Sequence, residues 1–221
     1  MTVLLFIAIA MGSYFLGGLN GALISSRLIY RQDIRNHGSG NPGLTNFYRT
    51  YGGQAVFLLI LIDILKTGIP VVVGGNLLES YAAFGTVEER VAIGGLWGGL
   101  FAMLGHAYPC LDKFRGGKCV LAGGTVALFV DWRVAIIVLG AFFLVVLLTR
   151  YVSLGSLTAA VLFPAALIYF PEYNTWPVLL AILCGALIAY RHTDNIKRLL
   201  QGKERKIRFG RKSNESASED T

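Results

Sequence analysis

Residues 38–46, GSGNPGLTN, combine flexible glycines with side chains that form hydrogen bonds. Their hydroxyl and amide groups leave no apolar face for a bilayer or a core, and Arg49 follows closely. A glycine-rich turn exposes backbone N–H groups, and such groups bind phosphate well. The segment therefore favours an anion-binding loop over its alternative, a plain structural turn.

A second polar segment, residues 105–118, reads GHAYPCLDKFRGGK. Its last residues open an apolar stretch, so the positive end of a helix dipole would add to the charges of Arg115 and Lys118. The sequence contains no Walker A pattern, which argues against nucleotide binding. The alternative is a basic turn that only follows the positive-inside rule.

A third polar segment, residues 191–204, reads RHTDNIKRLLQGKE. His192 and Asn195 are three residues apart and would share one face of a helix. Histidine titrates near neutral pH, so this pair among cations is a candidate acid, base or orienting group. The alternative is an ordinary histidine at a membrane interface.

Asp63 and Lys66 lie three residues apart inside an apolar run. Each charge alone would be costly within a membrane, whereas a pair that faces the interior of a bundle costs less. A structural ion pair and a substrate role for Lys66 are equally good interpretations. His106 precedes a proline-containing bend and is expected to cap the span before it.

The bulk composition excludes an ordinary soluble domain. Hydrophobic residues make up 54% of the 221 residues, charged residues only 15%, and the mean hydropathy is +0.59. Glycine occurs 27 times, as expected where helices approach closely in lipid. The three cysteines show no metal-ligand spacing and are read as free thiols. We expect no metal, no cofactor and no nucleic-acid partner.

The pattern of apolar segments predicts an all-α membrane protein, a bundle of about seven transmembrane helices. A span needs roughly 20 apolar residues. The apolar N-terminus lacks a basic region before it and is read as a retained helix. Residues 1–200 are expected to form a single transmembrane domain, and residues 201–221 a disordered, charged cytoplasmic tail. The candidate spans are 3–29, 53–75, 90–108, 118–131, 133–150, 154–171 and 175–191.

Positive charge predicts the orientation of the chain in the plasma membrane. Lys and Arg gather in the connections after the first, third, fifth and seventh spans, whereas the opposite connections are mainly acidic. Seven spans put every basic stretch on one side, which should be cytoplasmic, with the N-terminus outside. All the polar segments then lie on the cytoplasmic face, which predicts a single site there.

The three long polar motifs, in this order, resemble those of the bacterial integral-membrane glycerol-3-phosphate acyltransferases that use acyl phosphate, the PlsY type. The resemblance runs from Gly12 to about Glu204. It implies transfer of a fatty acyl group from acyl phosphate to position 1 of sn-glycerol 3-phosphate. The products would be lysophosphatidate and inorganic phosphate, and membrane lipid would surround the enzyme.

The resemblance also suggests site residues, to which Asn41, Asp63, Lys66 and His106 are added from the arguments above. The expected catalytic residues are Ser39, Arg49, Lys118, His192 and Asn195. The expected substrate-binding residues are Asn41, Thr45, Asn46, Lys66, Gly116, Gly117 and Ser153. A structural role is expected for Asp63, His106 and Glu204.

One position departs from the family pattern. The family commonly has glycine after the lysine of the second motif, and this chain has Cys119. A thiol beside Lys118 could act as a nucleophile, but the shared chemistry cannot depend on it. A tolerated small residue is the expected role. His106 and Asp112 are separated by five residues, so the His-x4-Asp mechanism of other acyltransferases is not expected.

Acyl phosphate is already activated, so catalysis needs mainly positioning and charge stabilisation. We expect Arg49 and Lys118, with the loop amides, to hold phosphate groups, and Ser39, Asn46 and Asn195 to orient them. The proton of the attacking hydroxyl would go either to His192 or to a substrate phosphate oxygen. A transporter for a phosphorylated metabolite is the rival class, but such proteins tend to use midplane sites between inverted repeats, and this sequence shows no repeat.

Overall fold

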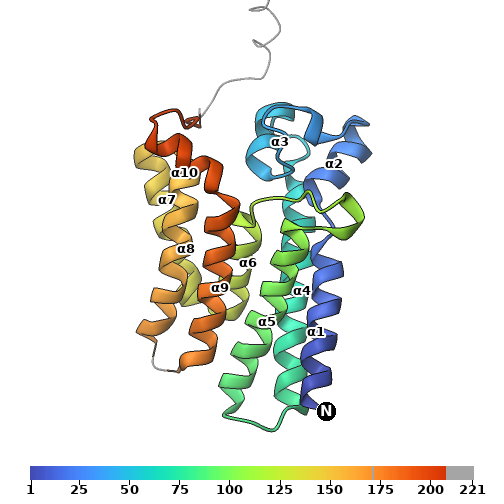
Figure 1. Ribbon diagram of the computed structural model, residues 1–221, viewed down its shortest axis with the longest axis vertical. Helices are drawn as coiled ribbons and strands as arrows, with labels where there is room; N and C mark the ends of the chain where they lie inside the picture. The colour runs from blue at the N-terminus through green and yellow to red at the C-terminus, as the bar shows by residue number, and fades with distance from the viewer. Residues whose placement is uncertain (171, 208–221) are drawn as a thin grey trace, which may run out of the picture.

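The computed structural model describes residues 1–170 and 172–207, and this part of the chain contains helices and no strand (Figure 1). The long helices are packed side by side with their axes roughly parallel (Figure 1). In chain order the elements are α1 Thr2–Gly17, α2 Gly21–Tyr30, η1 Ile34–Asn36, α3 Leu44–Tyr51, α4 Val56–Tyr81, α5 Val87–Ala107, η2 Cys110–Asp112, α6 Val120–Val130, α7 Trp132–Thr149, α8 Val152–Tyr169, α9 Thr175–Arg191 and α10 Thr193–Leu200.

Two groups of helices form the bundle. Helices α1, α4 and α5 pack on one another, and α6 to α9 form the second group, which contacts the first mainly through α5 with α9 and α6 with α4 and α5 (Figure 1). Gly74 of α4 and Gly94 of α5 face one another so closely that a Cβ on either would collide with the other's backbone. The glycine content expected from the sequence therefore serves close helix packing.

Side-chain caps define where several helices begin. The side chains of Asn20, Thr86, Asp131 and Asn174 accept hydrogen bonds from backbone N–H groups at the starts of α2, α5, α7 and α9. These N–H groups have no partner within the helix, so a cap contributes about 1 kcal/mol. Short polar residues between apolar runs thus determine where these helices begin.

The transmembrane count differs from the sequence-based expectation of about seven. Five helical stretches of the described chain are long and apolar enough to cross a membrane, and a sixth if α9 and α10, bent by 61°, count as one span. Helix α6 has only 11 residues and is therefore about 16 Å long, half the thickness of a bilayer core. Seven spans are not confirmed. The predicted first span, 3–29, corresponds to the stretch Thr2–Tyr30, which is one of these five, although the helix is interrupted between the end of α1 at Gly17 and the start of α2 at Gly21.

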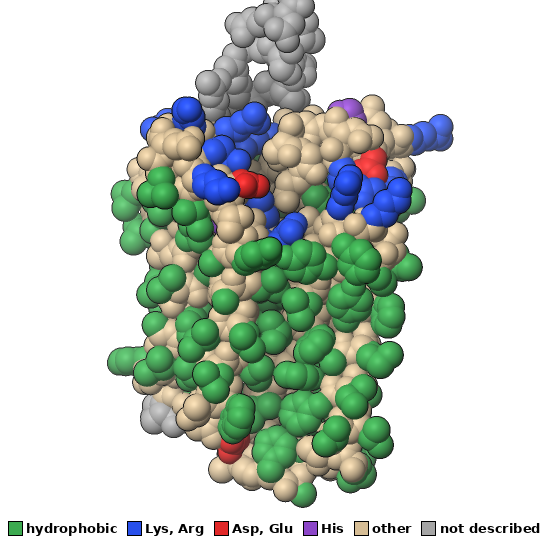
Figure 2. All heavy atoms as spheres, in the orientation of Figure 1, with side chains coloured by type: hydrophobic (Ala, Val, Ile, Leu, Met, Phe, Trp, Pro, Cys, Tyr) green, Lys and Arg blue, Asp and Glu red, His purple; other side chains and the backbone are tan. Residues whose placement is uncertain are grey.

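The polar connections meet at one end of the bundle. The segment from α2 to α3, the α5–α6 connection, the α7–α8 connection and α10 all lie at the end opposite the N-terminus (Figure 1). Figure 2 shows Lys and Arg side chains gathered there around a hollow, above a wide zone of hydrophobic side chains. A single polar face, as expected from the sequence, is what the structure has.

The predicted tail begins later than residue 201. Glu204 bonds with Ser153, Asn195 and Arg198, and the N–H of Ile207 donates to the carbonyl of Arg150. These contacts fasten residues 204–207 onto the bundle, so the expectation of disorder from residue 201 is wrong for them. The remainder of the predicted tail, 208–221, lies outside the described residues.

Candidate active site

A cavity of about 1560 Å³ opens at the polar end between the two helix groups. One part of the cavity wall carries the polar motifs. The other part is apolar and is formed by side chains of α6, α7 and α8 that include Leu128, Val138 and Phe163. All the sequence-predicted site residues line this cavity except Lys66 and Gly117. One cavity thus joins a polar chamber to an apolar groove that reaches into the bundle.

The GSGNPGLTN loop forms one side of the cavity. Gly38 and Gly40 have positive φ values of 60° and 70°, which explains their glycines. The buried Asn46 accepts from the N–H of Ser39 at 2.9 Å and donates to the carbonyl of His37 at 3.0 Å. Its side chain therefore holds the loop in shape, although the sequence suggested direct substrate binding.

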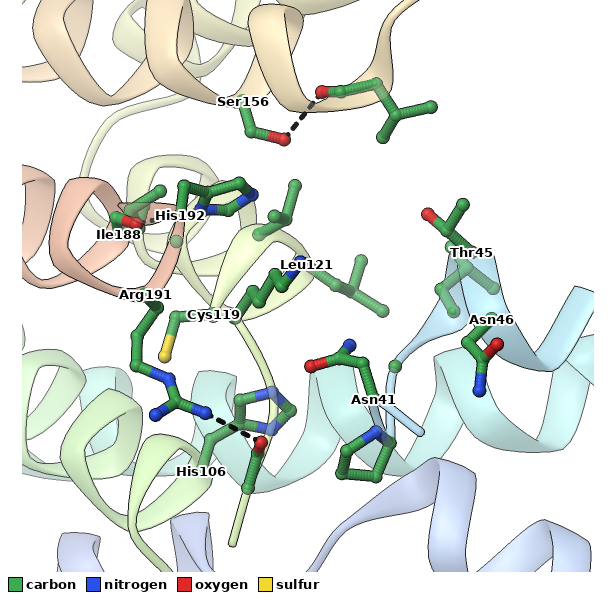
Figure 3. A pocket seen from close by; sticks show the side chains of 18 of the residues that line it. Asn41, Thr45, Asn46, His106, Cys119, Leu121, Ser156, Ile188, Arg191 and His192 are labelled. Atoms are coloured by element: carbon green, nitrogen blue, oxygen red, sulfur yellow. Dashed lines mark hydrogen bonds between the residues drawn. The ribbon is translucent and has the colours of Figure 1, made fainter. Parts of the chain in front are cut away.

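The side chains of Ser39, Asn41 and Thr45 line the cavity and have no hydrogen-bond partner among the described residues. Figure 3 shows Asn41 and Thr45 across the cavity from Cys119 and His192. Arg49, one turn after Thr45 in α3, lies at the cavity mouth and donates to the carbonyl of Arg205 at 3.4 Å. This wall offers neutral donors and one guanidinium to a ligand.

The glycine loop, residues 116–118, forms the opposite wall of the cavity together with the start of α6. Val120 and Leu121 line the cavity in the first turn of α6, and no side chain caps this helix. Their N–H groups have no acceptor in the described part of the chain. The N–H of Gly117, however, donates to the carbonyl of His106 at 3.0 Å and is not available to a ligand. Free amides at a helix N-terminus suit phosphate.

A hydrogen-bond network links Lys118 to the C-terminal segment. The Lys118 ammonium donates to Asn195 Oδ1, and Asn195 Nδ2 donates to Glu204 Oε1 at 2.6 Å. Ser153 Oγ donates to the same carboxylate oxygen at 2.8 Å, and Arg198 Nε donates to the other at 2.8 Å. The structural role expected for Glu204 is thus to connect Ser153 and Asn195.

Burial and neighbouring groups shift the pKa values of Lys118 and Glu204. Burial, and after it the nearby Arg198, lowers the pKa of Lys118 from its ordinary value. Burial opposes ionisation of Glu204, but the hydrogen bonds from Asn195, Arg198 and Ser153 outweigh it and leave the pKa of the carboxyl below its usual range. Glu204 is therefore ionised at neutral pH, and Lys118 gives up its proton more readily than a free lysine.

His192 sits buried at the break between α9 and α10. Its Nδ1 lies 2.8 Å from the carbonyl oxygen of Ile188. A carbonyl can only accept, so Nδ1 carries the proton and Nε2 of the neutral ring keeps a lone pair. This tautomer allows His192, which lines the cavity (Figure 3), to act as a base through Nε2.

Asp63, Lys66 and His106 form one buried group. The Lys66 ammonium lies 2.8 Å from Asp63 Oδ1 and 2.7 Å from His106 Nδ1, and Asp63 Oδ1 also accepts from the N–H of Gly21 at 3.0 Å. Lys66 is 2% exposed and does not line the cavity. The ion-pair interpretation therefore holds, and the substrate role suggested for Lys66 is corrected to a structural one. His106 does not cap α5 but bonds to Lys66.

Sequence reasoning missed several residues that shape the site. Asn20 donates to the carbonyl of Pro42 at 3.1 Å and so ties the first motif to α2. Asp112 pairs with Arg27 at 3.4 Å and with Arg35 at 3.6 Å, which joins the second motif to α2 and η1, the elements before the first motif. Arg191 bonds to the glycine loop, and its place beside His192 in the third motif was the signal for it. Asn20, a polar residue within the first predicted span, was a weaker signal.

The chain matches a family model described as glycerol-3-phosphate acyltransferase over residues 7–202. A glycerol-3-phosphate acyltransferase from Finegoldia magna is 37% identical over 210 residues, which cover 94% of this chain and 98% of the relative. One from Actinobacillus succinogenes is 39% identical over 202 residues, covering 91% and 94%.

Solved structures of PlsY (YgiH), an integral membrane glycerol 3-phosphate acyltransferase, are similar to the whole bundle. The glycerol 3-phosphate form matches with a TM-score of 0.80 at 32% identity, covering 92% of this chain and 96% of the other. The lysophosphatidic acid form matches with a TM-score of 0.78 at 31% identity, covering 92% and 95%. The chain therefore belongs to the glycerol-3-phosphate acyltransferase family of integral membrane enzymes, of the PlsY type.

Proposed function

We propose that this protein transfers a fatty acyl group from acyl phosphate to the 1-hydroxyl of sn-glycerol 3-phosphate, giving lysophosphatidate and inorganic phosphate. The observation that carries the proposal is the two-part cavity: a polar chamber with Arg49, Lys118 and unpaired helix amides continues into an apolar groove. An acyl phosphate has the same two parts, an anionic head and a long apolar tail. Its leaving group is small enough to stay within the chamber.

In the proposed mechanism, the glycerol hydroxyl attacks the acyl carbon and the bond from that carbon to the phosphate oxygen breaks. Lys118, Arg49 and the first amides of α6 stabilise the charge on the phosphate groups. Ser39, Asn41 and Thr45 orient the substrates from the facing wall. The hydroxyl proton passes to His192 Nε2 or to an oxygen of the departing phosphate, and no covalent acyl-enzyme forms.

We further propose that residues 1–200 act as one transmembrane acyltransferase domain in the plasma membrane. The polar end faces the cytoplasm and the N-terminus lies outside. The support is the positive-inside rule, because Lys and Arg gather at the end with the cavity (Figure 2).

Introduced cysteines test the orientation: Asn36→Cys should react only with a reagent on the cytoplasmic side and Ala83→Cys only from outside, with Cys110→Ser as background. Labelling of position 36 from outside would overturn it.

One assay tests the donor. Purified protein in detergent receives labelled glycerol 3-phosphate with either an acyl phosphate or the matching acyl-CoA, and lysophosphatidate and phosphate are measured together. We expect equal amounts of the two products with acyl phosphate and no product with acyl-CoA. Product formed only with acyl-CoA would refute the proposed donor. Activity in detergent, without a sealed compartment, also separates the enzyme from the rival transporter.

A further inference from the structure

Arg191 holds two consecutive carbonyls of the glycine loop. Its Nη2 donates to the carbonyl of Gly116 at 2.9 Å, and its Nε donates to the carbonyl of Gly117 at 3.0 Å. The residue ends α9, next to His192, and reaches across to the loop that precedes α6 (Figure 3). A planar guanidinium with donors in a fixed fork can bind two acceptors in this way, whereas a lysine ammonium is a point charge.

These two bonds fix the direction of two peptide planes. In a trans peptide the carbonyl and the following N–H point to opposite sides. With both carbonyls turned toward Arg191, the N–H groups of Gly117 and Lys118 must point away from it. The first of these donates to the carbonyl of His106, and the second has no acceptor in the described part of the chain. Arg191 therefore determines where the free amide of Lys118 points.

The loop needs such a restraint because glycine peptides rotate easily. Two adjacent glycines have no Cβ to limit their backbone conformations. Both are buried, and a Cβ on Gly116 or Gly117 would collide with His106. His106 is itself held by Lys66, and the Tyr108 ring lies 5.0 Å from the Arg191 guanidinium carbon. The loop is thus held from two sides, by Arg191 and by His106, and both of these residues line the cavity (Figure 3).

We propose that Arg191 is a positioning residue: by binding the Gly116 and Gly117 carbonyls, it presents the amide of Lys118 and the start of α6 to a substrate phosphate. The inference rests on the proposed function, in which this loop holds a phosphate. Arg191 acts through the geometry of its two hydrogen bonds and not through its charge. Removal of the two bonds should weaken phosphate binding while the rest of the bundle remains folded.

The test compares Arg191→Lys, which keeps the charge, with Arg191→Gln, which does not. The dissociation constant of glycerol 3-phosphate is measured by calorimetry without a donor, and the KM of acyl phosphate is measured in the assay. We expect both variants to show a rise of about tenfold in at least one of the two constants, which corresponds to loss of hydrogen bonds to a charged group. The kcat should change less. Which constant rises tells which phosphate the loop holds.

Arg90→Lys is the matched control. Arg90 donates to two backbone carbonyls, those of Phe84 and Gly85, at 3.0 Å each, and it lies at the opposite end of the bundle. Its replacement should lower the thermal midpoint about as much as Arg191→Lys and leave both substrate constants unchanged. If the Arg191 variants do not fold, Tyr108→Leu, which removes the supporting ring, should raise the same constants by roughly threefold.

Three results would overturn the proposal. The first is wild-type constants for both substrates in folded Arg191→Gln, because Arg191 would then only stabilise the bundle. The second is wild-type behaviour of Arg191→Lys beside a defective Arg191→Gln, since charge alone would then suffice. The third applies if neither Arg191 variant folds: Tyr108→Leu would then show wild-type constants for both substrates. Failure of the proposed donor is a separate result: the wild-type protein would be inactive with acyl phosphate, yet its binding of glycerol 3-phosphate would still report on Arg191.

Discussion

The ammonium of Lys118 donates a hydrogen bond to the amide oxygen of Asn195, a residue 77 positions later in the chain. This bond joins the loop before α6 to α10, and the other end of the same amide donates to Glu204. Asn195 is therefore the one side chain of this network that accepts from a cation and donates to a carboxylate. A side chain with only acceptors cannot replace it.

The first prediction concerns Asn195→Asp. Aspartate would still accept from Lys118, but it cannot donate to Glu204 and would place two carboxylates together. We expect a loss of activity of about 10- to 100-fold, as for a broken hydrogen bond to a charged group. The assay is acyl transfer to glycerol 3-phosphate by purified protein. Asn174→Asp is the control, because Asn174 also donates to a glutamate, Glu89, but at the opposite end of the bundle. Equal losses in the two variants would contradict the prediction.

A second prediction concerns alkaline pH. The pKa of Lys118 is lowered by burial, so its ammonium is lost at a lower pH than that of a free lysine, about 10.4. Charge is needed to bind phosphate, so kcat/KM should fall as pH rises through this lowered pKa. Lys118→Arg keeps its charge at every accessible pH and should shift the alkaline limb upward, although with lower maximal activity. Identical alkaline limbs in the two proteins would rule out Lys118 as the titrating group.

A third prediction concerns Cys119, which has a φ of 61° at the start of α6. This left-handed conformation costs an L-residue about 1–2 kcal/mol, which explains the glycine that the family pattern has there. Cys119→Gly should keep most of the activity, whereas the β-branched Cys119→Val should be strongly destabilised.

The Cys119 residue is 1% exposed and its thiol donates to the carbonyl of Met103 at 3.2 Å, so the thiol should not react as a nucleophile. Intact-mass analysis after incubation with acyl phosphate alone checks this point. An added acyl group that disappears in Cys119→Ser would show that direct transfer is wrong.

A fourth prediction concerns the length of the acyl chain. Phe163 and Ala159 line the apolar part of the cavity from α8. Ala159→Leu fills part of the groove and should shift the preference toward shorter acyl phosphates, and Phe163→Leu should shift it toward longer ones. Each methylene displaced from the groove costs about 0.8 kcal/mol, roughly fourfold in kcat/KM. A series of acyl phosphates of graded length measures the shift. Leu144→Ala, on an exposed side chain outside the cavity, should leave the preference unchanged.

The sequence alone determined the class of the protein and predicted most of the polar residues that line its cavity. Composition and hydropathy indicated a helical membrane protein, because long apolar runs are typical of transmembrane helices, which satisfy their backbone hydrogen bonds internally. The spacing of Asp63 and Lys66 indicated an ion pair, and the structure contains it. Polar motifs with glycines marked the loops, since local conformation depends on nearby residues.

Only the tertiary structure decided which partners these residues take. The sequence left Lys66 between an ion pair and a substrate role, and packing decided, because it puts His106, 40 residues away, within 2.7 Å of the Lys66 ammonium. The sequence already showed a short fourth apolar run, 118–131, but not the exact ends of α6 or the interruption after α1, because an apolar run shows that a segment is buried in lipid or protein but not where the helix stops. The two hydrogen bonds from Arg191 to the carbonyls of Gly116 and Gly117 join positions that are 75 and 74 residues apart. No local sequence pattern encodes such a contact, because the packing of the bundle brings the two elements together.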